Sequence, residues 1–242
     1  MIAILLNDAS FEQDIRELLM AFYPGETFTH KEEEAGEADL IVRGVRDGNS
    51  FSLDVTPVKK EAVHFALIYP DFSNRFETKN EIKQTLYRLL SAQTGRELPW
   101  GTLTGIRPTK IPMQMLDEGK TKEQIASYMK QTYLASDEKI NLSIAIAERE
   151  RALLSRLDYK NGYSLYIGIP FCPSTCLYCS FTSYPLTAWK TQVDAYLDAL
   201  EKELDYVAAK NYHRKLNSIY IGGGTPTTLE PYQLDRLIRK IR

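Results

Sequence analysis

The sequence has 242 residues, of which 43% are hydrophobic, and its formal net charge at pH 7 is −2. A chain of this length can bury a sizeable core in one or two domains, and its near-neutral charge does not supply the basic surface that nucleic-acid binding needs. The opening Met-Ile-Ala-Ile-Leu-Leu lacks a basic flank and is too short for a signal peptide. No apolar run is long enough to cross a bilayer. We therefore expect a cytoplasmic protein with reduced thiols, no nucleic-acid partner and no membrane span.

Residues 1–97 have the pattern of a small α/β (α+β) domain. Two capping boxes, Ser10-x-x-Gln13 and Thr78-x-x-Glu81, each precede apolar residues at helical spacing, and Gly95 is a suitable end for the second helix. Asp47-Gly48 tolerates the positive φ of a tight turn, so we expect a hairpin there. These predicted strands and helices suggest a mostly antiparallel sheet with helices packed on one face. The predicted strands are 2–6, 40–43, 51–55 and 63–69.

Residues 98–160 predict a loop followed by a helical connector. The loop 98–110 combines Trp100 with prolines, glycines and two cations. Such a loop either binds a ligand or holds two parts of a protein together, and we favour the second role, although Arg107 and Lys110 leave contact with an anion open. Thr121-x-x-Gln124 would begin a helix. The run around it has some likeness to a helix-turn-helix, but the chain lacks the basic face that this would require.

Residues 161–242 contain every cysteine of the chain, spaced C-x3-C-x2-C directly after an apolar run that is typical of a buried strand. Thiolates select zinc, copper(I) or iron–sulfur clusters. A structural zinc site needs a fourth protein ligand, and none of the three histidines has a zinc-finger spacing from the cysteines. The alternative is that the three cysteines are unconnected buried residues with a structural role only. Their clustering at the end of a predicted strand argues against this alternative. The cysteines are Cys172, Cys176 and Cys179, and the histidines are His30, His64 and His213.

A four-iron cluster bound by three cysteines leaves one iron without a protein ligand. A small molecule can bind that iron through its own amine and carboxylate, so such a site indicates chemistry rather than a structural role. The order of predicted elements around the cysteines is strand, loop, helix, strand, loop, helix, which is typical of a parallel barrel with its sites at the carboxyl ends of strands. The cysteine loop follows the first of these strands.

A glycine run, Gly222-Gly-Gly-Thr-Pro226, follows the second strand, 218–221. It lacks the Gly-Lys-Ser/Thr ending of a phosphate loop and the G-x-G-x-x-G pattern of a dinucleotide-binding fold. Glycine allows the backbone to approach a ligand closely and to present its amides. A plain turn from strand to helix is the alternative.

Both motifs resemble those of the radical S-adenosylmethionine (SAM) enzymes. The signature of that family is C-x3-C-x2-C with an aromatic residue before the last cysteine, here Tyr178. The segments Tyr166-Ile-Gly-Ile-Pro-Phe-Cys172 and Ile221-Gly-Gly-Gly-Thr-Pro226 are similar to the branch with oxygen-independent coproporphyrinogen III oxidase (coproporphyrinogen dehydrogenase), an oxidoreductase of porphyrin and haem biosynthesis. The resemblance covers residues 163–228, about a quarter of the chain, and implies a radical SAM (TIM-like) barrel.

The resemblance also implies cofactors and roles. In the family, an electron donor such as a flavodoxin or ferredoxin reduces a 4Fe-4S cluster, SAM is cleaved, and the resulting radical removes a hydrogen atom from the substrate. In coproporphyrinogen dehydrogenase a propionate then loses carbon dioxide and becomes a vinyl group. No further catalytic residue is assigned. Cys172, Cys176 and Cys179 would bind the cluster, Tyr178 would lie against the SAM adenine, Gly223, Gly224 and Thr225 would contact its methionine end, and Tyr166 would also reach SAM.

Three departures from the family pattern keep a second function open. Gly168 stands where a histidine is usual, and Phe181 stands where the best-studied oxidases have an extra cysteine, a loss shared with haem-binding chaperones built on the same barrel. A barrel takes about 250 residues, so residues 161–242 suffice for only about two to three βα units. We therefore expect a chain truncated within the barrel, itself inactive, whose parent protein acts on a porphyrinogen or, alternatively, carries haem.

Overall fold

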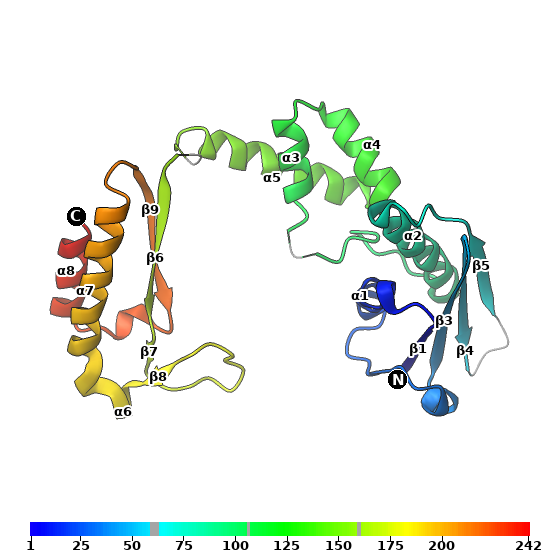
Figure 1. Ribbon diagram of the computed structural model, residues 1–242, viewed down its shortest axis with the longest axis horizontal. Coiled ribbons are helices and arrows are strands. Elements are labelled where there is room, and N and C mark those ends of the chain that lie inside the picture. Colours follow the sequence, from blue (N-terminus) through cyan, green and yellow to red (C-terminus); the bar gives the residue numbers. More distant parts are fainter. Residues whose placement is uncertain (59–62, 106, 159–160) are drawn as a thin grey trace. The chain divides into compact units, whose positions relative to one another are not determined.

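The computed structural model describes residues 1–58, 63–105, 107–158 and 161–242. The chain divides into two compact units, Met1–Arg151 and Ala152–Arg242, which are described one by one (Figure 1). The predicted domain boundary at residue 97 lies inside the first unit, and the one at residue 160 lies outside the described residues, so the three-part division stays a prediction. No helix within the described ranges has both the length and the apolar character to pass through a membrane.

The first unit contains a five-stranded sheet in the order β2-β1-β3-β4-β5. β1 pairs in parallel with β2 and β3, whereas β3–β4 and β4–β5 pair antiparallel. Gly48 turns the predicted β3–β4 hairpin with a φ of +57°. Antiparallel pairing covers most of the sheet, as expected, but β1 is parallel to both of its neighbours, because a helix after β1 returns the chain so that later strands run alongside it. The strands are β1 (Ile2–Leu6), β2 (Phe28–Thr29), β3 (Leu40–Asp47), β4 (Ser50–Pro57) and β5 (His64–Ile68).

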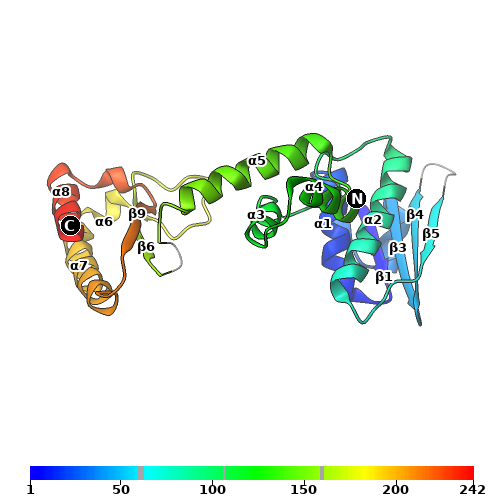
Figure 2. The same cartoon turned by 90° about the horizontal axis from the view of Figure 1, so that it is seen from above.

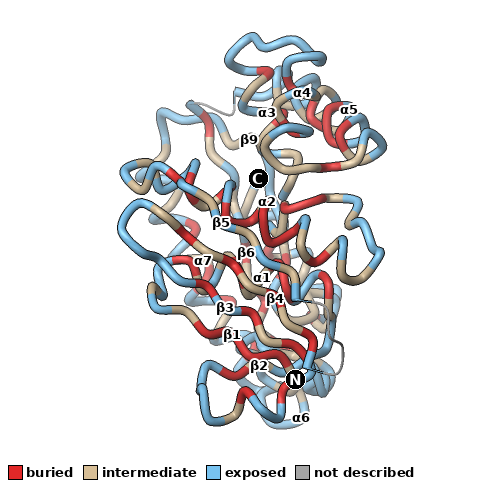
Figure 3. Tube along the Cα trace, turned by 90° about the vertical axis from the view of Figure 1, so that its right-hand side faces the viewer, coloured by how far each residue is buried: buried red, intermediate tan, exposed pale blue. Residues whose placement is uncertain are grey.

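Helices α1 (Glu12–Phe22) and α2 (Arg75–Thr94) cover one face of this sheet, as predicted (Figure 1). The core between them contains Phe22 and Phe51, both fully buried. Alternate residues of β1 enter a second, smaller cluster with the 3-10 helix η2 (Glu32–Glu37). Strand β1 is therefore buried on both faces, and buried positions recur along β1 and β3 (Figure 3).

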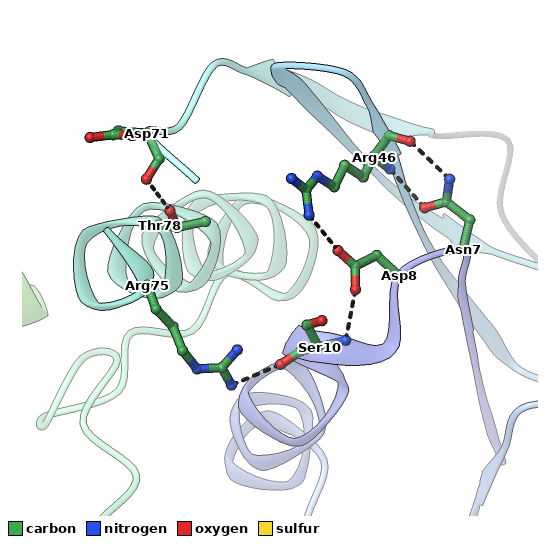
Figure 4. A network of polar contacts seen from close by, with 7 residues as sticks. All are labelled: Asn7, Asp8, Ser10, Arg46, Asp71, Arg75 and Thr78. Atoms are coloured by element: carbon green, nitrogen blue, oxygen red, sulfur yellow. Dashed lines mark hydrogen bonds and ion pairs between the residues drawn. The ribbon is translucent and has the colours of Figure 1, made fainter. Parts of the chain in front are cut away.

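Polar side chains hold the turn after β1, where the 3-10 helix η1 (Ala9–Phe11) begins (Figure 4). Asp8 accepts a hydrogen bond from the Ser10 amide at 3.0 Å and pairs with Arg46 of β3 at 3.0 Å. These contacts lower the pKa of Asp8 to about 2. Asn7 exchanges two hydrogen bonds with the Arg46 backbone, and Arg75 donates to the Ser10 carbonyl at 2.9 Å. The predicted Ser10 cap is thus wrong: Asp8 caps η1, and α1 begins at Glu12 without a side-chain cap.

Helix α2 begins before the predicted capping box. Asn74 accepts a hydrogen bond from the Glu77 amide at 3.2 Å and is the cap of the helix. The hydroxyl of Thr78, which was expected to be the cap, donates instead to the Asp71 carbonyl at 2.7 Å (Figure 4). The end of the helix is as predicted, because Gly95 adopts the left-handed conformation with a φ of +67°.

Three more helices confirm the helical connector, and together they enclose a separate core that includes Ile125, Met129 and Ile140. The predicted capping box at Thr121 is present with both of its hydrogen bonds. The last and longest of the three helices is prominent in Figure 2. The helices are α3 (Lys110–Asp117), α4 (Lys122–Tyr133) and α5 (Asp137–Leu154).

The loop between α2 and α3 is bound on both sides within the first unit. The Thr102 amide donates to the Tyr133 carbonyl at the end of α4, at 2.7 Å. Lys83 of α2 donates to the Thr104 hydroxyl at 2.9 Å, and that hydroxyl donates to Glu17 of α1 at 2.7 Å. Burial lowers the pKa of Lys83. The loop therefore joins α4 to the helices that cover the sheet, all within the first unit, and its role between two domains stays a prediction.

We expect Gly101→Ala to weaken this junction severely. Gly101 has a φ of +56°, and a Cβ there would lie 2.0 Å from the Tyr133 carbonyl oxygen. The loss in free energy of unfolding should be at least about 2 kcal/mol. It can be measured by urea unfolding followed by Trp100 fluorescence in a Trp189→Phe background. Gly105→Ala is the control, because nothing lies within 4 Å of its added Cβ; equal midpoints for both variants would contradict the close approach.

The second unit contains the parallel strands β6 and β9, with α7 and α8 against one face (Figure 1). Ile167 and Ile169 of β6 pack with Leu197 and Leu237 of the two helices. The order of strand, helix, strand, helix confirms the start of a barrel, and the described residues do not form a closed one. The elements are β6 (Tyr163–Ile169), β7 (Phe171–Cys172), β8 (Tyr184–Pro185), α6 (Leu186–Trp189), η3 (Lys190–Gln192), α7 (Val193–Lys210), β9 (Leu216–Gly223), η4 (Pro226–Thr228) and α8 (Pro231–Ile241).

Candidate functional site

The cysteine loop and the glycine loop follow neighbouring parallel strands. β6 ends at Ile169, after which the chain enters the cysteine loop through β7, and β9 ends within the glycine run at Gly223. The register pairs Ile169 with Gly223. The two loops therefore lie at the same edge of the sheet, where parallel α/β barrels gather their functional groups.

Hydrogen bonds join the two loops directly. The Gly224 amide donates to the Ile169 carbonyl at 2.7 Å, and the Thr225 amide donates to the Phe171 carbonyl at 2.8 Å. The Thr225 hydroxyl also lies 3.7 Å from the Cys172 sulfur, within reach of a hydrogen bond to it. A hydroxyl donor in this position would stabilise the thiolate form and tune a metal bound to it.

Two glycines are needed for this contact. A Cβ on Gly224 would lie 2.7 Å from the Cys172 sulfur and 2.7 Å from the Phe171 carbonyl oxygen. Gly223 has a φ of +101°, and a Cβ there would lie 2.8 Å from the Ile169 carbonyl oxygen. The glycine run was predicted to let the backbone approach a ligand, which stays a prediction; the structure shows a close approach of this run to the start of the cysteine loop.

Tyr196 of α7 supports the same strand end from the helix side. Its hydroxyl donates to the Gly168 carbonyl at 2.5 Å, and its ring meets Phe171 edge to face with 5.4 Å between centroids. Burial raises the pKa of Tyr196. In the sequence, Tyr196 lies at helical spacing with the apolar residues Val193 and Leu200, a pattern that by itself indicates only packing. The one signal for its second role was a hydroxyl-bearing ring among aliphatic residues, since a buried tyrosine hydroxyl usually finds a partner.

The three cysteines carry free thiols. Cys172 and Cys179 are partly buried, and Cys176 is exposed. The Cys179 amide donates to the Cys176 carbonyl at 3.0 Å, which closes a turn between these two residues. Among the described residues, no three His, Cys, Asp or Glu side chains are placed so that they could hold a metal ion. The structure thus brings Cys172 to the glycine loop, but it does not gather all three sulfurs at one point.

The two predicted aromatic contacts lie in different surroundings. Tyr166 is on the face of β6 opposite the helices and stacks on Tyr220 of β9, with 5.4 Å between the ring centroids. Tyr178 is on the cysteine loop and is 90% exposed. The structure therefore places Tyr166 in a defined position close to the strand end, whereas Tyr178 is held by few contacts with the described residues.

Comparison with known proteins agrees with this arrangement of motifs. Residues 166–242 match the family model of the Radical SAM superfamily. This part of the chain belongs to the radical SAM superfamily. That membership implies a 4Fe-4S cluster and SAM as cofactors. No solved structure matches the chain significantly.

Several curated proteins are similar to parts of the chain. The chain is 37% identical over 192 residues to the oxygen-independent coproporphyrinogen-III oxidase-like protein HemZ of Bacillus subtilis (strain 168), a match that covers 77% of this chain and 38% of HemZ. It is 46% identical over 78 residues to the heme chaperone HemW of the same organism, covering 32% of this chain and 20% of HemW. It is 39% identical over 79 residues to the oxygen-independent coproporphyrinogen III oxidase of Escherichia coli (strain K12), covering 33% of this chain and 17% of that protein.

The residues of the radical SAM domain fit these cofactors. Three free thiols provide the soft ligands that an iron–sulfur cluster requires. Beside Cys172, the absence of a side chain at Gly224 leaves backbone and a hydroxyl donor close to the sulfur. The chemistry of the thiols, and the space beside Cys172, thus suit an iron–sulfur cluster, although the three sulfurs are not gathered around one point.

We expect Gly224→Ala to impair cluster binding, because its Cβ would displace the Cys172 sulfur or separate the two loops. Loss of a supporting contact around a metal typically weakens binding about 10- to 100-fold. Iron and acid-labile sulfide per chain after anaerobic reconstitution would measure the effect. Gly168→Ala is the control, since its added Cβ meets only the Tyr166 ring at 3.8 Å. Full iron content in Gly224→Ala would show that the glycine contact does not support the site.

Proposed function

We propose that the protein containing this chain is a radical SAM oxidoreductase of porphyrin biosynthesis, which decarboxylates coproporphyrinogen III to protoporphyrinogen IX without oxygen. The observation that carries the proposal is the extent of the match to HemZ, which covers 77% of the chain and so includes residues of both units. The HemW matches cover 32–33% of the chain. Likeness beyond the radical SAM domain therefore favours the oxidase-like protein over the chaperones.

In this proposal Cys172, Cys176 and Cys179 would hold a 4Fe-4S cluster, and SAM would bind beside it. When bound, the cluster and SAM supply the one-electron chemistry that removes a hydrogen atom from a substrate propionate. Thr225 would donate a hydrogen bond to the sulfur of Cys172, and this contact would help to keep that thiolate in place. A cytoplasmic location and an electron donor such as a flavodoxin or ferredoxin complete the proposal.

The remaining site residues would bind SAM. Gly223 and Gly224 would offer backbone at the methionine end, because they have no side chains to block its approach. Thr225 would lie between this end and Cys172. Tyr166 would reach SAM from the open face of β6, and Tyr178 would lie against the adenine. The exposure of Tyr178 means that its ring would have to settle against SAM on binding.

We expect Cys176→Ala to lower iron content after anaerobic reconstitution by at least about 10-fold, because a thiolate ligand is lost. Cys176 is exposed, so the circular dichroism spectrum should stay unchanged. His213→Ala, a change at one of the three candidate fourth ligands for zinc, is the control and should keep its iron. Zinc in the wild-type protein, or full iron in a variant without any of the three cysteines, would rule out the cluster and with it the proposed function.

A second candidate is a haem-binding chaperone. Over the 78 residues that match HemW of Bacillus subtilis the identity is 46%, against 39% over the 79 residues that match the Escherichia coli oxidase. Phe181, in the position where the resemblance implies an additional cysteine for the oxidases, is consistent with this alternative. A chaperone would bind haem without changing it.

Anaerobic product analysis distinguishes the two candidates. The whole protein that contains this chain should be reconstituted with iron and sulfide and supplied with coproporphyrinogen III, SAM and a reductant. We expect two vinyl groups and two molecules of carbon dioxide per porphyrinogen, and no product with a Cys176→Ala variant. Stoichiometric haem binding without any decarboxylated product would instead favour the chaperone.

A further inference from the structure

The face of the β6–β9 pair that points away from α7 and α8 carries three pairs of identical residues, one on each strand. The register places a serine opposite a serine, a tyrosine opposite a tyrosine and a glycine opposite a glycine. The serine hydroxyls are 2.8 Å apart, and the tyrosines are 63% and 66% exposed. The two strands thus carry hydroxyls, then aromatic rings, then bare backbone toward the edge with the cysteine loop. The pairs are Ser164 with Ser218, Tyr166 with Tyr220, and Gly168 with Gly222.

The tyrosine rings lean over the glycines. The Tyr166 and Tyr220 rings stack with an interplanar angle of 25°. A Cβ on Gly222 would lie 2.5 Å from the Tyr220 ring and 2.7 Å from the Tyr166 hydroxyl. The hydroxyl of Tyr166 therefore lies over the neighbouring strand, next to the residue that precedes Gly223. Both rings would have to move if position 222 carried a side chain.

A structural role alone would not explain this placement well. Cross-strand aromatic pairs do stabilise sheets, by about 0.2–1 kcal/mol. Here, however, both rings remain largely exposed, and neither belongs to the core of the second unit. The stack instead directs one hydroxyl across the sheet toward the glycine loop, which is joined to the start of the cysteine loop.

We propose that Tyr220 and Gly222 are positioning residues for Tyr166 in the SAM site. Tyr220 supports the Tyr166 ring by stacking, and Gly222 leaves the space in which the Tyr166 hydroxyl lies. Together they hold the ring ready at the glycine loop before SAM binds, which lowers the cost of ordering it on binding. This inference rests on the proposed function, because it takes SAM as the ligand that Tyr166 contacts.

The test is SAM affinity, measured by equilibrium dialysis of labelled SAM against the anaerobically reconstituted whole protein, with iron content measured in parallel. Loss of an aromatic stack of about 0.5–1.5 kcal/mol corresponds to about 2- to 10-fold in affinity. Tyr220→Leu should therefore weaken SAM binding by this factor at unchanged iron content. Tyr220→Phe keeps the stack and should bind like the wild type. Tyr212→Leu, at an 87% exposed position, is the control and should have no effect.

A double-mutant cycle decides whether Tyr220 acts through Tyr166. In a Tyr166→Leu background, Tyr220→Leu should cause no further loss of SAM affinity. Weaker binding by Tyr220→Phe, additive losses in the cycle, or wild-type affinity in Tyr220→Leu would each overturn the positioning role while leaving the proposed function intact. A wild-type protein that contains the cluster but binds no SAM would overturn both.

Discussion

The candidate site depends on two backbone hydrogen bonds, from Gly224 to Ile169 and from Thr225 to Phe171. They bring the loop after β9 against the start of the loop after β6, so that a cysteine sulfur, a threonine hydroxyl and bare backbone adjoin one another. The contact is possible only because no side chain occupies position 224. The glycine at position 224 therefore has a steric role, because it leaves room for the sulfur of Cys172.

Successive side chains of β6 lie on opposite faces of the sheet, and the two faces have different roles. Ile167 and Ile169 enter the core with α7 and α8, while Tyr166 and Gly168 lie on the opposite face. Tyr196 reaches from α7 to the Gly168 carbonyl and so supports the strand from its core side. Packing on one face thus positions groups on the other, and the strand end is held before any cofactor binds.

The first unit has cores of its own, and it contains none of the residues predicted to bind the cluster or SAM. Its loop from α2 to α3 is held by Lys83, Thr104 and Glu17 on one side and by the end of α4 on the other. These contacts make the sheet and the helices α3 to α5 a single compact unit. Because the similarity to HemZ extends into this unit, the unit is part of what the two proteins share, and not an unrelated addition to a radical SAM domain.

Local sequence determined the features that depend on a few neighbouring residues. The three thiols, the glycine run, the Asp47-Gly48 hairpin and the Thr121 capping box need only side-chain chemistry and backbone preference, and the sequence predicted each of them. Caps were mistaken where two candidates lie close together: Asn74 caps α2 in place of Thr78, and Asp8 caps the 3-10 helix η1 just before α1, where Ser10 was expected to act. Propensity cannot rank such neighbours, since burial and nearby partners decide between them.

Only the tertiary structure decided which distant residues meet. The parallel pairing of β1 with β3, the stack of Tyr166 on Tyr220 and the bond from Tyr196 to Gly168 all depend on strand register and helix packing. Register is a property of two strands together, so neither strand's sequence contains it alone. The sequence by itself therefore identified the family and the candidate ligands, while the fold determined which backbone and which rings surround them.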